Sequence, residues 1–138
     1  PAEKLLAELE NAADARLFAS GMAAATAVFQ ALKPGDKVIA PKVMYWALRK
    51  WLQTFGVDSG LDVRFVDTTN LNELRDAIAE RQPTLIWLET PGNPLWTVTD
   101  IAAVADMACN RFHSGNPPAD QATGSWRRYC YALRHQIP

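Results

Sequence analysis

Residues 17–29, LFASGMAAATAVF, combine a serine, a glycine and an alanine-rich segment in a pattern that could bind a phosphate group. We expect a strand over residues 15–20 that ends at Ser20, a turn at Gly21, and a helix over residues 21–32. The free N–H groups of the first helical turn, the helix dipole and the serine hydroxyl all favour a phosphate. Taken alone, the pattern is more often a serine-capped turn, and it matches neither GxGxxG nor a P-loop.

A second group of polar residues lies in residues 85–96, LIWLETPGNPLW. A buried strand would carry Glu89 to its carboxyl end, and the prolines on either side of Asn93 would stiffen the loop that follows. A rigid amide just past a parallel strand suits a polar ligand atom. A proline-rich turn without a ligand is the simpler interpretation of this motif on its own.

Tyr45 is the third candidate, because it starts a helix expected over residues 45–55, directly after the apolar segment KVIAP. Its ring could lie against a flat heteroaromatic molecule. An isolated tyrosine is more often an amphipathic packing residue, so Tyr45 alone does not indicate a ligand.

The elements that must position these residues alternate along the chain. Strands are expected over 15–20, 37–41, 62–68 and 83–90, and helices over 3–12, 21–32, 45–55, 70–80 and 97–108. Asn70 is placed to cap one helix, and Thr99 or Asp100 another. This alternation with short links predicts an α/β fold with parallel strands, in which ligands bind at the carboxyl ends of the strands.

The composition is that of a globular domain, with 138 residues of which 49% are hydrophobic and 21% charged, and a net charge of −1. No apolar run reaches the roughly 20 residues that a bilayer requires, and the first residues do not resemble a signal peptide. We therefore expect a cytoplasmic protein with no membrane partner. Cys109 and Cys130 lack a CxxC spacing, which predicts neither a disulfide framework nor a metal site.

Together, three segments are far more specific than any one motif: LFASGMAAATAVFQALKPGDKVIAP, YWALRKWL and LIWLETPGNPLWTVTDIAAVADMA. In order and spacing they resemble the transsulfuration family of pyridoxal-phosphate enzymes, which includes cystathionine γ-synthase and the homoserine-ester sulfhydrylases. The resemblance covers residues 5–108 and implies the first part of a fold-type I large domain, truncated here. It implies pyridoxal 5′-phosphate as cofactor, an amino-acid substrate, and homotetrameric intact relatives.

The resemblance also assigns roles to the candidate residues. It implies that Ser20, Gly21 and Met22 cradle the cofactor phosphate. Tyr45 would stack on the pyridine ring, although YWAL stands where many relatives have Tyr-Gly-Gly. It further implies that Asn93 reaches polar atoms of the cofactor or substrate, and that Glu89 braces the Asn93 loop.

Two catalytic residues of the family have no counterpart in this sequence: the aspartate that holds the pyridine nitrogen protonated and the Schiff-base lysine. The lysines are Lys4, Lys33, Lys37, Lys42 and Lys50, and all precede the position where that lysine belongs. No catalytic residue is therefore assigned, and the chain as written is expected to be an inactive fragment.

Residues 109–138 differ from the rest and are expected to form an irregular tail with no domain of its own and no strand that completes the sheet. Residues 1–110 carry 10 basic and 14 acidic side chains, whereas residues 111–138 carry four arginines and one aspartate. Read one base out of frame, residues 111–137 can encode DSTVATPLLTRPLALGADIVMHSATKY, which resembles the next segment of the family and contains its aspartate and lysine. We interpret the tail as an out-of-frame product and not as a nucleic-acid-binding arm.

Two alternatives stay open. One is a noncatalytic α/β binding module whose basic tail, with Arg127, Arg128 and Arg134, binds an acidic partner. The other is a damaged-gene product without a stable fold, because half a sheet exposes strand edges and apolar helix faces.

Overall fold

The computed structural model describes residues 2–10, 12–113 and 130–134 and divides the chain into two compact units, Pro1–Leu32 and Lys33–Pro138. Within these described ranges, no helix combines the length and apolar character that crossing a membrane requires. The same residues contain no cluster of three or more His, Cys, Asp or Glu side chains placed to bind a metal ion. Residues 114–129, which include Arg127 and Arg128, and residues 135–138 lie outside the described residues.

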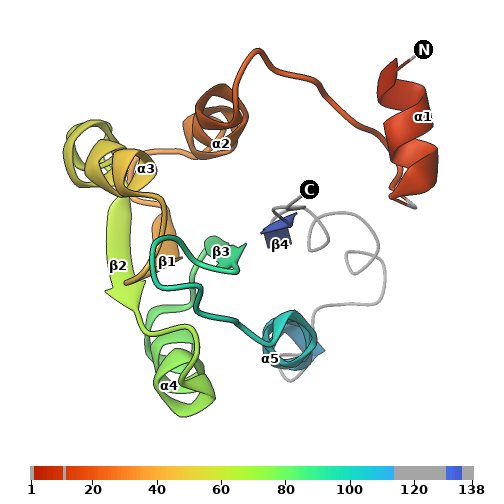
Figure 1. Cartoon of the computed structure of the whole chain (residues 1–138). Coiled ribbons are helices and arrows are strands. Elements are labelled where there is room, and N and C mark those ends of the chain that lie inside the picture. The colour runs from red at the N-terminus through yellow and green to blue at the C-terminus, as the bar shows by residue number, and fades with distance from the viewer. Residues whose placement is uncertain (1, 11, 114–129, 135–138) are drawn as a thin grey trace. The chain divides into compact units, whose positions relative to one another are not determined.

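The first unit contains two helices, α1 (Ala2–Leu9) and α2 (Gly21–Gln30), which agree with two of the predicted helices (Figure 1). The strand predicted over residues 15–20 is wrong, because the structure has only irregular chain there. A strand needs a neighbour for its backbone groups. Here the N–H of Leu17 instead donates to the Glu3 carboxylate over 3.0 Å.

The second unit contains a wholly parallel sheet in the order β2-β1-β3-β4, which confirms the predicted α/β fold (Figure 1). Its strands are β1 (Lys37–Pro41), β2 (Asp62–Val66), β3 (Leu85–Thr90) and β4 (Cys130–Arg134). Its helices are α3 (Trp46–Trp51), the π-helical η1 (Leu52–Gly56), α4 (Leu71–Arg81) and α5 (Ile101–His113).

The order of the strands reverses at β1. The chain passes from β1 to its neighbour β2 through α3, and then returns through α4 to β3, on the other side of β1. Because parallel crossovers are right-handed, α3 lies on one side of the sheet, and α4 and α5 lie on the other (Figure 1). The connections that leave β1 and β3 therefore lead to opposite faces of the sheet, and the carboxyl ends of these two strands form the switch point at which such folds bind ligands.

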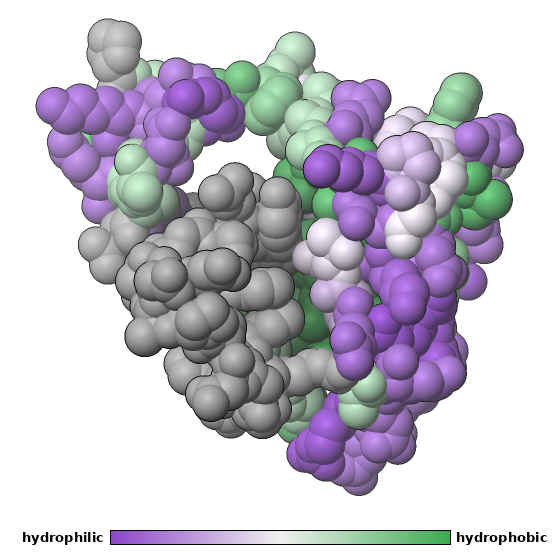
Figure 2. Space-filling view, turned by 180° about the vertical axis from the view of Figure 1, so that it is seen from behind, coloured by the Kyte–Doolittle hydropathy of each residue, from purple (hydrophilic) through white to green (hydrophobic). Residues whose placement is uncertain are grey.

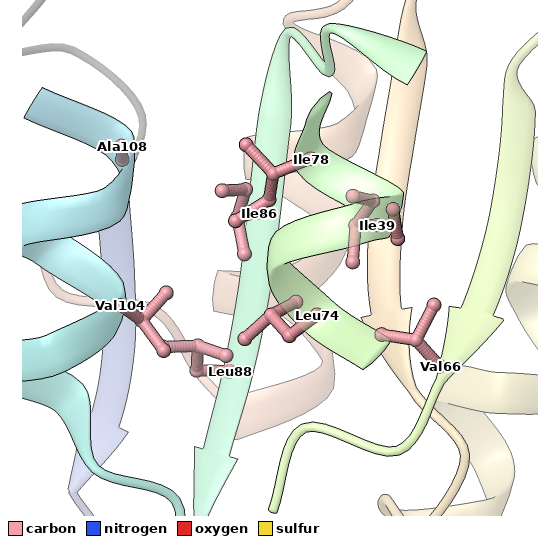
Figure 3. Close-up of a cluster of buried hydrophobic side chains, with 9 residues drawn as sticks. Ile39, Val66, Leu74, Ile78, Ile86, Leu88, Val104 and Ala108 are labelled. Carbon is pink, nitrogen blue, oxygen red and sulfur yellow. The ribbon is translucent and has the colours of Figure 1, made fainter. Parts of the chain in front are cut away.

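The core of the second unit lies between the sheet and helices α4 and α5. Alternate residues of the strands point toward these helices, as the two-residue period of a strand requires (Figure 3). The cluster consists of Ile39, Val66, Leu74, Ala77, Ile78, Ile86, Leu88, Val104 and Ala108, all at most 7% exposed. Burial of this apolar surface is the main stabilising contribution to the parallel sheet that carries the candidate site.

Local signals explain where the helices begin. The Asn70 side chain accepts hydrogen bonds from the N–H groups of Asn72 and Glu73, as expected of the cap at the start of α4. At the start of α5, Asp100 is the cap, since its carboxylate accepts from the N–H of Ala103 over 3.0 Å. Thr99, the other candidate cap, forms different hydrogen bonds.

Further features differ from the predictions. Helix α5 spans Ile101–His113, so it begins four residues after and ends five residues beyond the predicted range 97–108. The expectation that no strand of the tail completes the sheet is wrong, because β4 pairs in parallel with β3 from Ile86–Cys130 to Thr90–Arg134. Parallel pairing satisfies the backbone groups on the side of β3 that β1 leaves free. The domain boundary at residue 108 stays a prediction.

The surface retains exposed apolar side chains. Figure 2 shows hydrophobic residues still visible among the hydrophilic ones. Those that are more than 60% exposed are Leu9 in the first unit and Trp46, Phe55, Leu95, Trp96 and Val98 in the second. Three of them, Leu95, Trp96 and Val98, lie on the loop that leaves β3.

Candidate functional site

Glu89 and Tyr45 are in direct contact at the carboxyl ends of β3 and β1, where the strand order reverses. Glu89 is only 3% exposed, and its Oε2 accepts a hydrogen bond from the backbone N–H of Tyr45 over 2.7 Å. Its Oε1 accepts from the indole N–H of Trp87 over 3.3 Å. Both oxygens of a buried carboxylate thus have donors, which offsets the cost of removing the group from water.

Tyr45 occupies the position just before α3, and its backbone is fixed while its ring stays accessible. Tyr45 is 38% exposed as a residue, and the centroid of its ring lies 6.2 Å from that of Trp46, a residue that is 69% exposed. The Tyr45 side chain makes no hydrogen bond that caps α3. Glu89 therefore sets the position of the Tyr45 backbone without covering the ring, and a flat molecule could lie against it.

Asn93 lies exposed on the loop between β3 and α5, and other residues of the loop hold it in place. The N–H of Gly92 donates to the carbonyl of Thr97 over 2.7 Å, which closes the loop below Asn93. A Cβ atom on Gly92 would lie 2.6 Å from the Thr97 hydroxyl and 3.0 Å from the carbonyl oxygen of Val43. Only glycine permits this close approach to the chain that leads to Tyr45.

The role predicted for Glu89 changes in one respect. Its carboxylate forms hydrogen bonds with Tyr45 and Trp87, whereas the loop that carries Asn93 is tied by Gly92 and by threonines. No local pattern indicates the Glu89–Tyr45 contact, because 44 residues separate the two. A glycine between Pro91 and Pro94 indicates a tight turn, so a structural role of Gly92 could be predicted from the sequence. The close approach of Gly92 to the carbonyl of Val43 could not.

A polar cluster follows β1 and β2. The Lys42 ammonium donates to Glu73 over 2.8 Å, and this hydrogen bond is the main reason that the pKa of Glu73 is lowered. The Thr69 hydroxyl donates to the Asp67 carboxylate over 2.6 Å and is the main reason that the pKa of Asp67 is lowered. The cluster joins the chain after β1 to the first turn of α4, and it contains none of the predicted ligand residues.

In the first unit, Ser20, Gly21 and Met22 form the beginning of α2. The extended Ser20 caps the helix, since its hydroxyl accepts from the N–H of Ala23 over 3.1 Å. Among the described residues, no hydrogen bond is found to the N–H groups of Gly21 or Met22. Gly21 is exposed, and a Cβ atom there would have no neighbour within 4 Å. The protein's own packing therefore does not require glycine at this position, whereas an anion that approaches the backbone closely does.

The structure brings two of the predicted residues into contact, Tyr45 and Glu89, with Asn93 on the loop next to them. Ser20, Gly21 and Met22 belong to the first unit, where they present two free N–H donors beside a hydroxyl. The geometry fits an aromatic group against Tyr45 and, separately, a phosphate at α2.

Comparison with known proteins identifies relatives over most of the chain. The family model described as "Cys/Met metabolism PLP-dependent enzyme" matches residues 2–113. The chain is 39% identical over 109 residues to cystathionine γ-lyase of Dictyostelium discoideum, and 40% identical over 106 residues to the chloroplastic cystathionine β-lyase of Arabidopsis thaliana. These alignments cover 79% and 77% of the chain and 28% and 23% of the relatives.

A solved structure with the same fold is that of cystathionine γ-lyase from Lactobacillus plantarum, complexed with L-serine. It matches with a TM-score of 0.73 and 36% identity over 78% of this chain and 28% of its own. The chain thus spans about a quarter of the length of the relatives it matches.

Proposed function

Because the chain belongs to the Cys/Met metabolism family of pyridoxal-phosphate-dependent enzymes, we propose that it is the first, cofactor-binding part of a transsulfuration enzyme. The family uses pyridoxal 5′-phosphate. The intact enzyme would catalyse γ-elimination or γ-replacement on a homoserine ester or a sulfur-containing amino acid. When bound, the cofactor supplies an electron sink that eases the breaking of bonds at the substrate carbons next to the amino group.

In this proposal, the start of α2 binds the phosphate. The N–H groups of Gly21 and Met22 and the hydroxyl of Ser20 donate to its oxygens, and the helix dipole adds a favourable field. The empty space around Gly21 supports this role, because a phosphate needs that space.

The contact between Glu89 and Tyr45 is the observation that carries the rest of the proposal. It places an accessible aromatic ring on a fixed backbone at the point where the strand order reverses, the position at which sheets of this kind bind ligands. Tyr45 would orient the pyridine ring by stacking, and the Asn93 amide would bind a polar atom of the cofactor or substrate.

We also propose that this chain alone does not turn over substrate. None of its five lysines lies in the setting of the family's Schiff-base lysine, and of these Lys42 is paired with Glu73. The intact enzyme would be a homotetramer in the cytoplasm, with neither nucleic acid nor membrane as a partner.

The binding test uses isothermal titration calorimetry with pyridoxamine 5′-phosphate, which lacks the aldehyde that would react with surface lysines. Pyridoxamine is the matched ligand without phosphate. We expect the phosphate form to bind at least about tenfold more tightly, because charge-assisted hydrogen bonds are the strong ones. Equal affinity for the two ligands, or no binding of either, would contradict the proposal.

Ser20→Asp is the matched variant for the phosphate site. Aspartate caps a helix as well as serine does, so the stability of α2 is retained. Its negative charge repels a phosphate, so the preference for the phosphate form should disappear. If the Ser20→Asp chain still prefers the phosphate form, the phosphate does not bind at Ser20.

The reading frame of the tail has its own test. Sequencing the encoding DNA from codon 105 to well beyond codon 138 should reveal an open alternative frame that spells the family segment with its aspartate and lysine. A shifted frame that closes at once would instead favour the binding module with a basic tail. The pairing of β4 with β3 is the observation that supports this second candidate.

A further inference from the structure

Three threonines join the chain after β2, the end of β3 and the start of α5. The hydroxyls of Thr68 and Thr99 are hydrogen-bonded to each other over 2.8 Å, and both residues are at most 5% exposed. The backbone N–H of Thr99 donates to the hydroxyl of Thr90 over 3.1 Å. The chain Thr68–Thr99–Thr90 thus fastens both ends of the β3–α5 loop to the neighbouring connection.

The loop between these threonines is closed a second time. Gly92 and Thr97 pair through a hydrogen bond of 2.7 Å, and only the tip between them, which carries Asn93, is exposed throughout. Valine has nearly the same shape as threonine but lacks the hydroxyl group. Valine at these positions would therefore provide the same apolar packing, and the hydroxyl pair is not needed for it. A buried hydroxyl is unfavourable unless it is paired, so the pair is stable only in this arrangement of the loop.

We propose that Thr68, Thr90 and Thr99 are positioning residues that hold the Asn93 amide in place for the ligand. This inference rests on the proposed function of Asn93 and adds to it the residues that fix the amide. They act through the backbone of the loop and do not themselves touch cofactor or substrate.

The test compares Thr99→Val with Thr99→Ser by amide hydrogen exchange. Thr99→Val keeps the shape and removes the hydroxyl, whereas Thr99→Ser keeps the hydroxyl. In Thr99→Val we expect exchange of the Gly92 N–H to become about tenfold faster, the effect of one lost buried hydrogen bond on local opening. The N–H of Ile39, in the central strand, should exchange as before, and Thr99→Ser should behave as the unaltered chain.

Thr69→Val is the matched control, because its hydroxyl lies on the same connection after β2 but donates to Asp67 and is exposed. It should leave exchange at Gly92 unchanged. If Thr99→Val also leaves it unchanged, or if all amides of the second unit accelerate together, the inference is wrong.

Binding of pyridoxamine 5′-phosphate separates this inference from the proposed function. Thr99→Val should weaken binding by no more than Asn93→Ala does, and Thr99→Ser should restore it. Faster exchange in Thr99→Val without any loss of affinity would overturn the positioning role. If the variants show the expected exchange rates but the chain binds neither ligand form, the proposed function is wrong. The conclusion that the threonines hold the β3–α5 loop in place would still stand.

Discussion

The carboxylate of Glu89 accepts a hydrogen bond from the backbone N–H of Tyr45 over 2.7 Å, across 44 residues of sequence. One buried acid at the end of β3 thereby sets where α3 begins. The consequence is that the backbone of Tyr45 is positioned by the sheet itself, through a residue that a ligand need not touch.

Glu89→Gln should destabilise the chain. Both carboxylate oxygens accept hydrogen bonds, whereas glutamine offers one oxygen and directs its NH₂ group at the second donor. We expect a loss of about 2 kcal/mol in the free energy of unfolding, measured by urea denaturation followed by circular dichroism. The control is Glu80→Gln, which removes only an exposed ion pair with Arg64 and should cost less than about 1 kcal/mol. Equal losses in the two variants would contradict this account of Glu89.

Tyr45→Phe and Tyr45→Ala should separate the ring from the hydroxyl. Both keep the backbone N–H that Glu89 accepts, so neither should move the start of α3. Phenylalanine keeps the stacking surface and should retain the affinity for pyridoxamine 5′-phosphate. Alanine should weaken it about tenfold, the magnitude of one aromatic contact. Trp46→Ala is the control, since it removes the adjacent exposed ring and should have no effect.

Gly21→Ala should leave the fold intact and weaken phosphate binding. A Cβ atom there meets no protein atom within 4 Å, and alanine favours a helix over glycine by up to about 1 kcal/mol. The added methyl group would occupy the space we assign to the phosphate. Calorimetry should show less preference for the phosphate form. Ala27→Gly, within the same helix, should lower stability without changing that preference. A preference lost in Ala27→Gly but kept in Gly21→Ala would contradict a phosphate site at Gly21.

The ion pair between Lys42 and Glu73 should make part of the stability depend on pH. The pKa of Glu73 is lowered from its ordinary value of 4.5, first by the hydrogen bond from Lys42. A carboxylate with a lowered pKa stabilises the folded state above that ordinary value, and the contribution is lost as the pH falls through the folded-state pKa. The destabilisation caused by Lys42→Met should therefore be visible at pH 7 and fade below pH 4.5. If the difference in unfolding free energy between the unaltered chain and Lys42→Met is the same at pH 7 and pH 3, this account of the ion pair is wrong.

The parallel sheet could be predicted from the sequence, and the contacts at its edge could not. Strand β1 was predicted to the residue, because KVIAP is an apolar run between clear turn signals. The strand at residues 15–20 was predicted wrongly, because an apolar run does not reveal that Glu3 accepts from the backbone of Leu17. Strand β4 was missed because its pairing depends on the free side of β3, a property of the assembled sheet.

The same limit applies to the site. Ser20, Tyr45, Glu89 and Asn93 are candidate site residues because their types stand at the ends of predicted elements. The hydrogen bond between Glu89 and Tyr45 joins residues 44 positions apart, and the one between Thr68 and Thr99 joins residues 31 positions apart. The hydrogen bond between Trp87 and Glu89 joins alternate residues of one strand. Such pairs follow from the order of the strands, which local patterns do not specify.

The burial of Trp87 gives the contact between Glu89 and Tyr45 an intrinsic optical probe. Trp87 is 1% exposed with its indole N–H on the Glu89 carboxylate, whereas Trp46 and Trp96 are 69% and 64% exposed. In a chain with Trp51→Phe and Trp126→Phe, acrylamide in solution should therefore quench the fluorescence of Trp46 and Trp96 more strongly than that of Trp87. Because Glu89 joins this indole to the backbone of Tyr45, the protection of Trp87 from acrylamide reports on the integrity of this contact without any label.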